Sequence, residues 1–397
     1  MSILAALQAK VNAVDSSTSM SEILKLMYTV KDHPYKSVYD SAGAMPLDSA
    51  SVGSIRYADN RNAMYMLVGV DSGWKLIDSD ASTAAPVSFS LQGSNFGYAL
   101  GTGNGPSYYN NLQTSQLEAY PYTSDAGGTD VGDLAEANNE NSGGASSTHG
   151  YRHGGKIYPA QSTEVSKDTS EKFTFASNTQ IGLLPNMTQT QVTALAQREA
   201  VTNGSHNYLF GGAATAPGGN KLNVIQKAAT TTDTAFTDVG DLLQVGTNHG
   251  GHASTTHAYA ATSAAAQSDI IQKVPFASDG NSTDVGDAGG GQGGGAHNSS
   301  STHGYMYGGY ISTPPYTSNA IHKFSFASDG NSTSVATLPA GRSERGGGNQ
   351  STTNGYFHNA SAYSTIYRFP FAAEDTITNV GNISDANGAR YNGSTQY

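Results

Sequence analysis

The chain has 397 residues, a formal net charge of −11 and only 20 Lys and Arg, which excludes a nucleic-acid-binding protein because neutralising phosphates requires clustered cations. It has no cysteine, so disulfides, thiolate nucleophiles and Cys-based metal sites are excluded. With 47 Gly, 23 Tyr and 13% charged residues, the composition is typical of short strands joined by small-residue turns.

Residues 1–85 predict a small α+β domain. Apolar residues in 3–14 follow helical spacing, and "SSTSMSEILKLMYTV" (16–30) begins with a serine cap, so we expect two short helices. "VGSIRYADNRNAMYMLVGVDSGWKLID" (52–78) alternates apolar and polar residues between two turns and predicts a three-strand meander. "DSDASTAAP" (78–86) is interpreted as a linker.

The N-terminal stretch "MSILAALQAKVNAV" lacks the basic region and the unbroken apolar core of a signal peptide. No later window approaches eighteen apolar residues, so we expect no membrane span. The chain is therefore expected to be made in a cytoplasm. If it acts outside a cell, we expect it to leave by another route, such as assembly into a particle released by lysis.

Residues 86–397 contain two motifs that recur in step. One is a tetrad of the Val-Gly-Asp-Leu type, preceded in most copies by an aromatic-x-aromatic strand; the tetrads begin at Val131, Ile181, Val239, Val285, Val335 and Val380. The other is a Ser-Thr-His-Gly-Tyr motif that falls between the tetrads; its tyrosines are Tyr98, Tyr151, Tyr208, Tyr259, Tyr305 and Tyr356. The repeat unit of roughly 50 residues holds several short strands.

A repeat of this length with about four strands is typical of a propeller blade. We therefore predict a mainly β protein: a six-bladed β-propeller over 86–397, preceded by the α+β domain of 1–85. The C-terminal "GARYNGSTQY" resembles the opening of another unit, and we expect it to complete the first blade and close the ring.

The units "STHGYMYGG" and "KFSFASDGNST" resemble the kelch-like propeller repeats of virion structural proteins from marine tailed phages. The likeness covers residues from about 87 to the end. Residues 1–85 are similar to the openings of phage tail-fibre and decoration proteins. This resemblance implies a protein assembled on the particle, often as an oligomer, with its propeller facing outward.

Four histidines occupy equivalent places two residues before the motif tyrosine: His149, His206, His257 and His303. If their strand were innermost, they could face the central channel and bind a metal or an anion. The preferred interpretation is structural, with each histidine stabilising its own blade by hydrogen bonds to the neighbouring backbone. We expect no metal and no cofactor.

Asp279-Gly280 and Asp329-Gly330 are interpreted as hairpin turns. Oxygen-bearing residues around Asp279 could also imitate a calcium loop, but the sister copy replaces two of the later acids.

Five tyrosines in segments that interrupt the repeat are candidates for stacking on a sugar: Tyr108, Tyr109, Tyr158, Tyr310 and Tyr316. The alternative for these residues is packing at blade edges.

The sequence favours a non-enzymatic phage virion protein with no catalytic residues. Residues 1–85 would dock on other tail or capsid proteins, and the propeller would serve host-surface adhesion, with a glycan as ligand, or decoration. We expect a homo-oligomer located in the virion. Two alternatives are a glycan-degrading depolymerase that uses carboxylates on a propeller face and a purely structural connector or cement protein.

Overall fold

The computed structural model describes two parts of the chain. In the C-terminal part it describes residues 91–101, 114–138, 140–160, 163–184, 195–196, 199–214, 221–247, 249–263, 268–289, 295–309, 318–342, 346–358, 364–384 and 393–396. In the N-terminal part it describes the backbone of residues 38–39, 55–58, 63–69 and 73–79. The chain divides into two compact units, Met1–Ser88 and Phe89–Tyr397.

The N-terminal unit contains a four-stranded sheet in the order β1-β2-β3-β4. Its strands are β1 (Val38–Tyr39), β2 (Ile55–Ala58), β3 (Ala63–Gly69) and β4 (Gly73–Ser79). The antiparallel meander β2-β3-β4 confirms the three strands predicted from the alternating pattern, and β1, which pairs parallel to β2, was not predicted. The two expected helices lie outside the described residues.

The C-terminal unit is a propeller of six four-stranded antiparallel sheets, as predicted. Blade 1 joins the chain ends: β32 (Gly393–Gln396), β5 (Phe96–Leu100), β6 (Gln116–Pro121) and β7 (Thr129–Asp133). Blade 2 is β8 (Ser142–Ala145), β9 (His149–His153), β12 (Ser170–Thr174) and β13 (Gln180–Leu184). Blade 3 is β15 (Glu199–Thr202), β16 (His206–Phe210), β18 (Leu222–Ala229) and β19 (Thr237–Gly246).

Blade 4 is β20 (Gly250–Ala253), β21 (His257–Ser263), β22 (Ser268–Pro275) and β23 (Thr283–Asp287). Blade 5 is β24 (Ala296–Ser299), β25 (His303–Tyr307), β26 (Ser318–Ser325) and β27 (Thr333–Arg342). Blade 6 is β28 (Gly347–Gln350), β29 (Asn354–His358), β30 (Thr365–Pro370) and β31 (Thr378–Asn382). Two small ribbons accompany the blades, formed by β10 (Lys156–Ala160) with β11 (Thr163–Ser166) and by β14 (Leu195–Ala196) with β17 (Ala213–Ala214).

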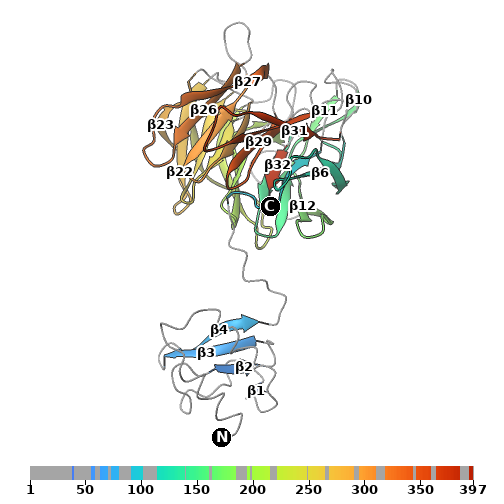
Figure 1. Ribbon diagram of the computed structural model, residues 1–397, viewed down its shortest axis with the longest axis vertical. Coiled ribbons are helices and arrows are strands. Elements are labelled where there is room, and N and C mark those ends of the chain that lie inside the picture. The colour runs from blue at the N-terminus through green and yellow to red at the C-terminus, as the bar shows by residue number, and fades with distance from the viewer. Residues whose placement is uncertain are drawn as a thin grey trace. The chain divides into compact units, whose positions relative to one another are not determined.

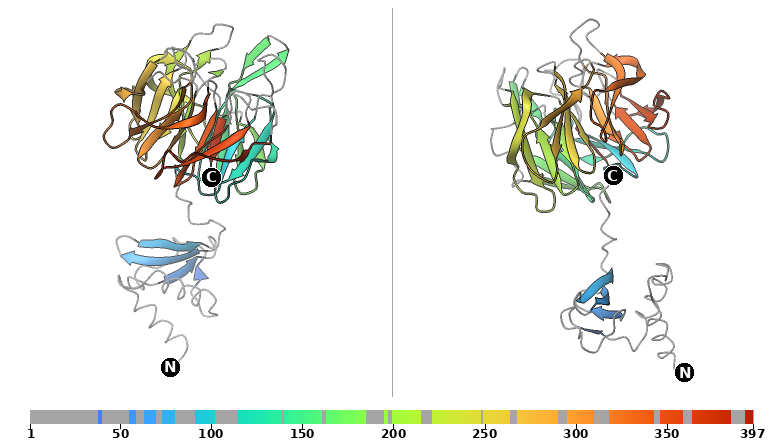
Figure 2. Two further views of the ribbon diagram at one scale, coloured as in Figure 1. Left: turned by 45° about the horizontal axis from the view of Figure 1, so that its top comes forward. Right: turned by 90° about the vertical axis from the view of Figure 1, so that its left-hand side faces the viewer.

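The first strand of each blade lies innermost, since β32, β8, β15, β20, β24 and β28 contact one another in ring order. The blades follow one another in chain order around this centre (Figure 2). The predicted closure is confirmed, because β32 pairs antiparallel with β5 and thereby joins the last strand to the first blade (Figure 1).

The two repeated motifs form the core between blades. The motif tyrosine lies on the second strand and packs against the aromatic pair on the third strand of the next blade: the Tyr259 ring centroid is 5.5 Å from Phe324 and 4.8 Å from Phe326. Tyr305 repeats this with the pair of blade 6, and Tyr356 repeats it with the pair of blade 1. The repeat therefore persists because each half of it is buried by the other half in a neighbouring blade.

Blade 3 departs from this pattern because its third strand has no aromatic pair. Tyr151 of blade 2 packs instead in a cluster with Ala228 and Phe236, whose ring comes from the segment just before β19. The buried aromatic surface is thus supplied from another strand, and the blade keeps its place in the ring.

Candidate functional site

The two ends of the blades differ sharply. At one end, which we call the regular face, every described connection from first to second strand has three residues: 146–148, 203–205, 254–256, 300–302 and 351–353. At the other end, the variable face, the connections from second to third strand range from four residues (264–267) to sixteen (154–169). Length variation without loss of the scaffold is typical of a face that carries binding residues, so the variable face is the candidate binding surface.

In the sequence, the five candidate tyrosines all belong to second-to-third connections. Tyr158 lies in β10, within the ribbon β10-β11 that is inserted between the second and third strands of blade 2. Tyr108 and Tyr109 of blade 1 and Tyr310 and Tyr316 of blade 5 lie outside the described residues. Sugar binding by these residues stays a prediction.

The base of the blade 2 insertion is a buried network of charges. Arg152, at the end of β9, forms an ion pair with Glu171 and donates a hydrogen bond to the Glu136 carbonyl at 2.5 Å. Lys156 pairs with Glu140 at 2.9 Å between the nitrogen and oxygen, and Lys167 pairs with Glu136 at 3.0 Å. Burial lowers the pKa of Arg152 to about 9, although Glu136 opposes this change.

This network balances three carboxylates against three cations. A carboxylate held by a buried cation is poorly suited to act as a general acid, because the cation stabilises its charged form. The arrangement therefore supports the inserted ribbon, and sequence reasoning missed it because its members come from three separate segments.

The four equivalent histidines do not lie on the innermost strand. His149, His206, His257 and His303 each begin a second strand at the regular face, so the condition for a channel-facing ring is not met. Each Nδ1 lies within hydrogen-bonding distance of the preceding hydroxyl, 2.8 Å for Thr148 and His149 and 2.9 Å for Ser205 and His206. The partner is thus a neighbouring side chain, whereas we had expected backbone. Burial lowers the pKa of all four rings.

The acidic turns join adjacent blades. Asp279 pairs with Lys227 of the preceding blade at 2.7 Å, and Asp329 pairs with Lys273 at 2.9 Å. In each turn, the aspartate that could have been a calcium ligand is thus paired with a lysine. Equivalent pairs join blade 2 to 3, blade 5 to 6 and blade 6 to 1; they are Lys172–Asp233, Lys323–Glu374 and Arg368–Asp125.

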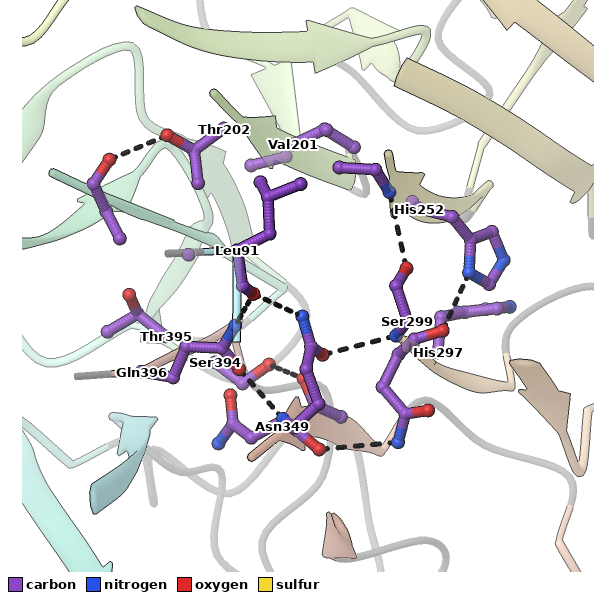
Figure 3. Close-up of a pocket in the computed structure, with 18 of the residues that line it drawn as sticks. Leu91, Val201, Thr202, His252, His297, Ser299, Asn349, Ser394, Thr395 and Gln396 are labelled. Carbon is purple, nitrogen blue, oxygen red and sulfur yellow. Dashed lines mark hydrogen bonds between the residues drawn. The ribbon is translucent and has the colours of Figure 1, made fainter. Parts of the chain in front are cut away.

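The channel contains a cavity at the regular face, with a volume of about 80 Å³, which is enough for several water molecules. It is lined by the last residues of all six inner strands and by Leu91. The Leu91 carbonyl accepts hydrogen bonds from the side-chain amides of Gln350, at 2.9 Å, and Gln396 (Figure 3). The chain therefore enters the propeller through the regular face.

Two buried histidines border this cavity. The rings of His252 and His297 point away from its centre (Figure 3), and their centroids are 5.4 Å apart. His252 Nδ1 lies 3.0 Å from the Asn298 carbonyl, and neither Nε2 has a hydrogen-bond partner. Burial lowers the pKa of His252 to about 4 and that of His297 well below its usual range. Sequence reasoning missed both because neither belongs to the repeated motif.

The described residues contain neither a cluster of metal ligands nor a membrane-spanning helix. No group of three or more His, Cys, Asp or Glu side chains there is placed to hold a metal ion. In the same residues, no helix has the length and apolar character needed to cross a membrane.

Comparison with known proteins supports the fold. No family model matches the sequence, and no curated protein does. Among solved structures, the protein YjhT matches with a TM-score of 0.54 at 11% sequence identity, over 73% of this chain and 100% of that chain. At this identity the likeness shows a β-propeller and carries no function with it.

Proposed function

We propose that this protein is a non-enzymatic virion component of a tailed phage, in which residues 1–85 dock on other tail or capsid proteins and the propeller presents its variable face to the host surface. The observation that carries this proposal is the polarity of the propeller. The chain enters at Leu91 on the regular face, while the connections of unequal length are on the opposite face. A protein tethered at one face is free to expose the other.

The rigidity of the blades supports the display of weak contacts. Five interblade ion pairs and the strand β32 hold the ring closed, so loops at the variable face keep fixed positions at their bases. Several propellers on one particle would raise the effective concentration of a weak glycan contact by orders of magnitude.

The buried charge network at the variable face favours adhesion over glycan cleavage. Glu136, Glu140 and Glu171 are each engaged by a lysine or an arginine. A glycoside hydrolase requires a pair of carboxyl groups that face the scissile bond, and each of these three carboxylates is engaged in an ion pair within the scaffold.

The proposal is tested in two steps. First, an antibody against the chain should label purified tailed-phage particles from the source culture in immunogold electron microscopy; unlabelled particles from a culture that expresses the chain count against the virion assignment. Second, the full chain should bind host cells and surface polysaccharide without releasing reducing sugar. Sugar release would replace adhesion by the depolymerase function, and labelling without any cell binding would favour the connector function.

The ligand-binding part is tested on Tyr158, the one candidate tyrosine in a described strand. Tyr158→Ala should weaken cell retention at least several-fold if the ring stacks on a sugar, since base or sugar stacking on an aromatic ring is typically worth about 1 kcal/mol or more. Phe96→Ala, which removes a 39% exposed ring at the regular-face end of β5, is the matched control. Equal retention of wild type and Tyr158→Ala removes Tyr158 from the site.

A further inference from the structure

The fourth strand of a blade is normally covered by the next blade. At the junction of blades 4 and 5, Asn331 Oδ1 accepts a hydrogen bond from the Asp287 backbone N–H at 3.0 Å, and the Ser332 N–H donates to the Asp287 carbonyl at 2.7 Å. Asn281 and Ser282 make the same two contacts with Asp241 at the junction of blades 3 and 4. The tetrad glycine lies beneath this turn: a Cβ on Gly286 would be 2.4 Å from Gly330.

Among the residues that the structure describes, none provides this cover at the junction of blades 2 and 3. A Cβ on Gly182, the tetrad glycine of blade 2, would meet nothing within 4 Å. Ile181 is 49% exposed and Leu183 is 44% exposed, whereas the residues equivalent to Ile181 in the other blades are buried or half-buried. The cause is the blade 3 turn, "TTTDTAF" (230–236), which has no Asn-Ser pair to reach back over the strand.

The uncovered strand also differs in charge. Leu183 stands where blades 1, 3 and 4 carry Asp133, Asp241 and Asp287. A charged residue on an outer strand discourages pairing with another chain, and an exposed apolar edge invites it. On the next blade, β19 adds Leu243 and Val245, which are 51% and 49% exposed. Four of the six exposed large apolar residues among the described ones therefore lie on the outer strands of two consecutive blades.

The occupant that fits this edge is a second copy of the chain. Copies that each carry a net charge of −11 repel one another, so contact is favoured where the outer strand has lost its aspartate. A two-fold axis brings the same strand of both copies together. Two apolar strands can pack against each other there, whereas two acidic strands repel. We propose that β13 is a self-association edge, on which Ile181 and Leu183 of one copy pack against the same residues of another.

The test compares two substitutions at equivalent positions of different blades. Leu183→Asp gives blade 2 the residue that blades 1, 3 and 4 already carry, so the blade is expected to tolerate it. Thr337→Asp makes the equivalent change in blade 5, where the native residue is not apolar. The mass of the full chain is measured by analytical ultracentrifugation between about 1 and 100 µM, and circular dichroism checks that each variant is folded.

We expect wild type and Thr337→Asp to associate with rising concentration beyond the 41.1 kDa protomer, and Leu183→Asp to have about half their mass at the highest concentration. Equal masses for wild type and Leu183→Asp overturn the proposal, whether both are monomers or both are oligomers that associate through another surface. The proposal is also overturned if Thr337→Asp dissociates the chain as much as Leu183→Asp does. If a different protein covers this edge, wild type and Leu183→Asp have equal masses, and the proposal is likewise overturned.

Discussion

His358 offers a quantitative test of how tightly the blades are packed. Its ring ends β29 at the variable-face end of blade 6 and lies 5.7 Å from the Tyr120 ring of blade 1, centroid to centroid. A Cβ on Gly347 would be 2.4 Å from His358 Cε1, so the ring fills the space that this glycine leaves. Neither ring nitrogen has a hydrogen-bond partner, and burial lowers the pKa from 6.5 to about 4.

The sign of the effect follows from proton binding. Between pH 6.5 and 4 the unfolded chain binds a proton on this ring and the folded chain does not, so the free energy of unfolding falls as pH falls through this range. The contribution of His358 is fully present above pH 6.5 and is lost as the pH approaches 4. A tenfold difference in proton affinity is worth about 1.4 kcal/mol, which gives a loss of about 2–3 kcal/mol at pH 4.5 and a somewhat larger loss at the limit.

The assay is urea unfolding of the full chain, followed by circular dichroism at pH 7.5 and pH 4.5. Phenylalanine has no titrating group and keeps an aromatic ring beside Tyr120, so on acidification the free energy of unfolding of His358→Phe should fall by about 2–3 kcal/mol less than that of wild type. His257→Gln is the comparison: it removes a partly exposed ring whose pKa burial also lowers, so it should reduce the loss by a smaller amount than His358→Phe. If wild type and His358→Phe lose the same free energy, the ring is not buried as described.

Three further predictions concern the closure and the junctions of the ring. Gly286→Ala should destabilise the protein by about 1–3 kcal/mol more than Gly182→Ala in urea unfolding, because both glycines have positive φ but only Gly286 is covered by the next blade; equal effects would show that the blade 2 junction is covered too. Ending the chain at residue 392 removes β32 and should lower the free energy of unfolding by at least about 4 kcal/mol, because about four hydrogen bonds between β32 and β5 are lost. Removing Tyr397 alone should have little effect. A double-mutant cycle of Lys273→Met and Asp329→Asn should give a coupling of about 0.5–1 kcal/mol that weakens in 1 M salt, and a salt-independent value would argue against an ion pair.

The repeat pattern was sufficient to predict the blades because their core is built from the repeated residues themselves. Tyr259, for example, could be placed on a buried strand from its position in the motif, and the structure buries it against Phe324 and Phe326 of the next blade. The closing strand could be predicted for the same reason, since "GSTQ" at the end of the chain repeats the start of a blade.

The sequence could not predict which strand of a blade lies innermost, and this affected the candidate site. The four equivalent histidines could line the channel only if they lay on the innermost strand. That strand is formed instead by the small Gly-rich segments before each motif, such as "GGHA" in β20. Blades 2 to 6 pair their four strands in chain order, and the repeat period contains no information on whether the first or the last of them faces inward.

The sequence by itself determined the class of fold, the number of blades and the position of the seam, because each of these depends on residues that recur at fixed spacing. Only the tertiary structure decided that Asp329 pairs with Lys273, that Leu91 lines the cavity at one end of the channel and that blade 2 leaves an apolar edge open. These features depend on contacts between residues tens to hundreds of positions apart, whose distances are fixed only when the ring closes.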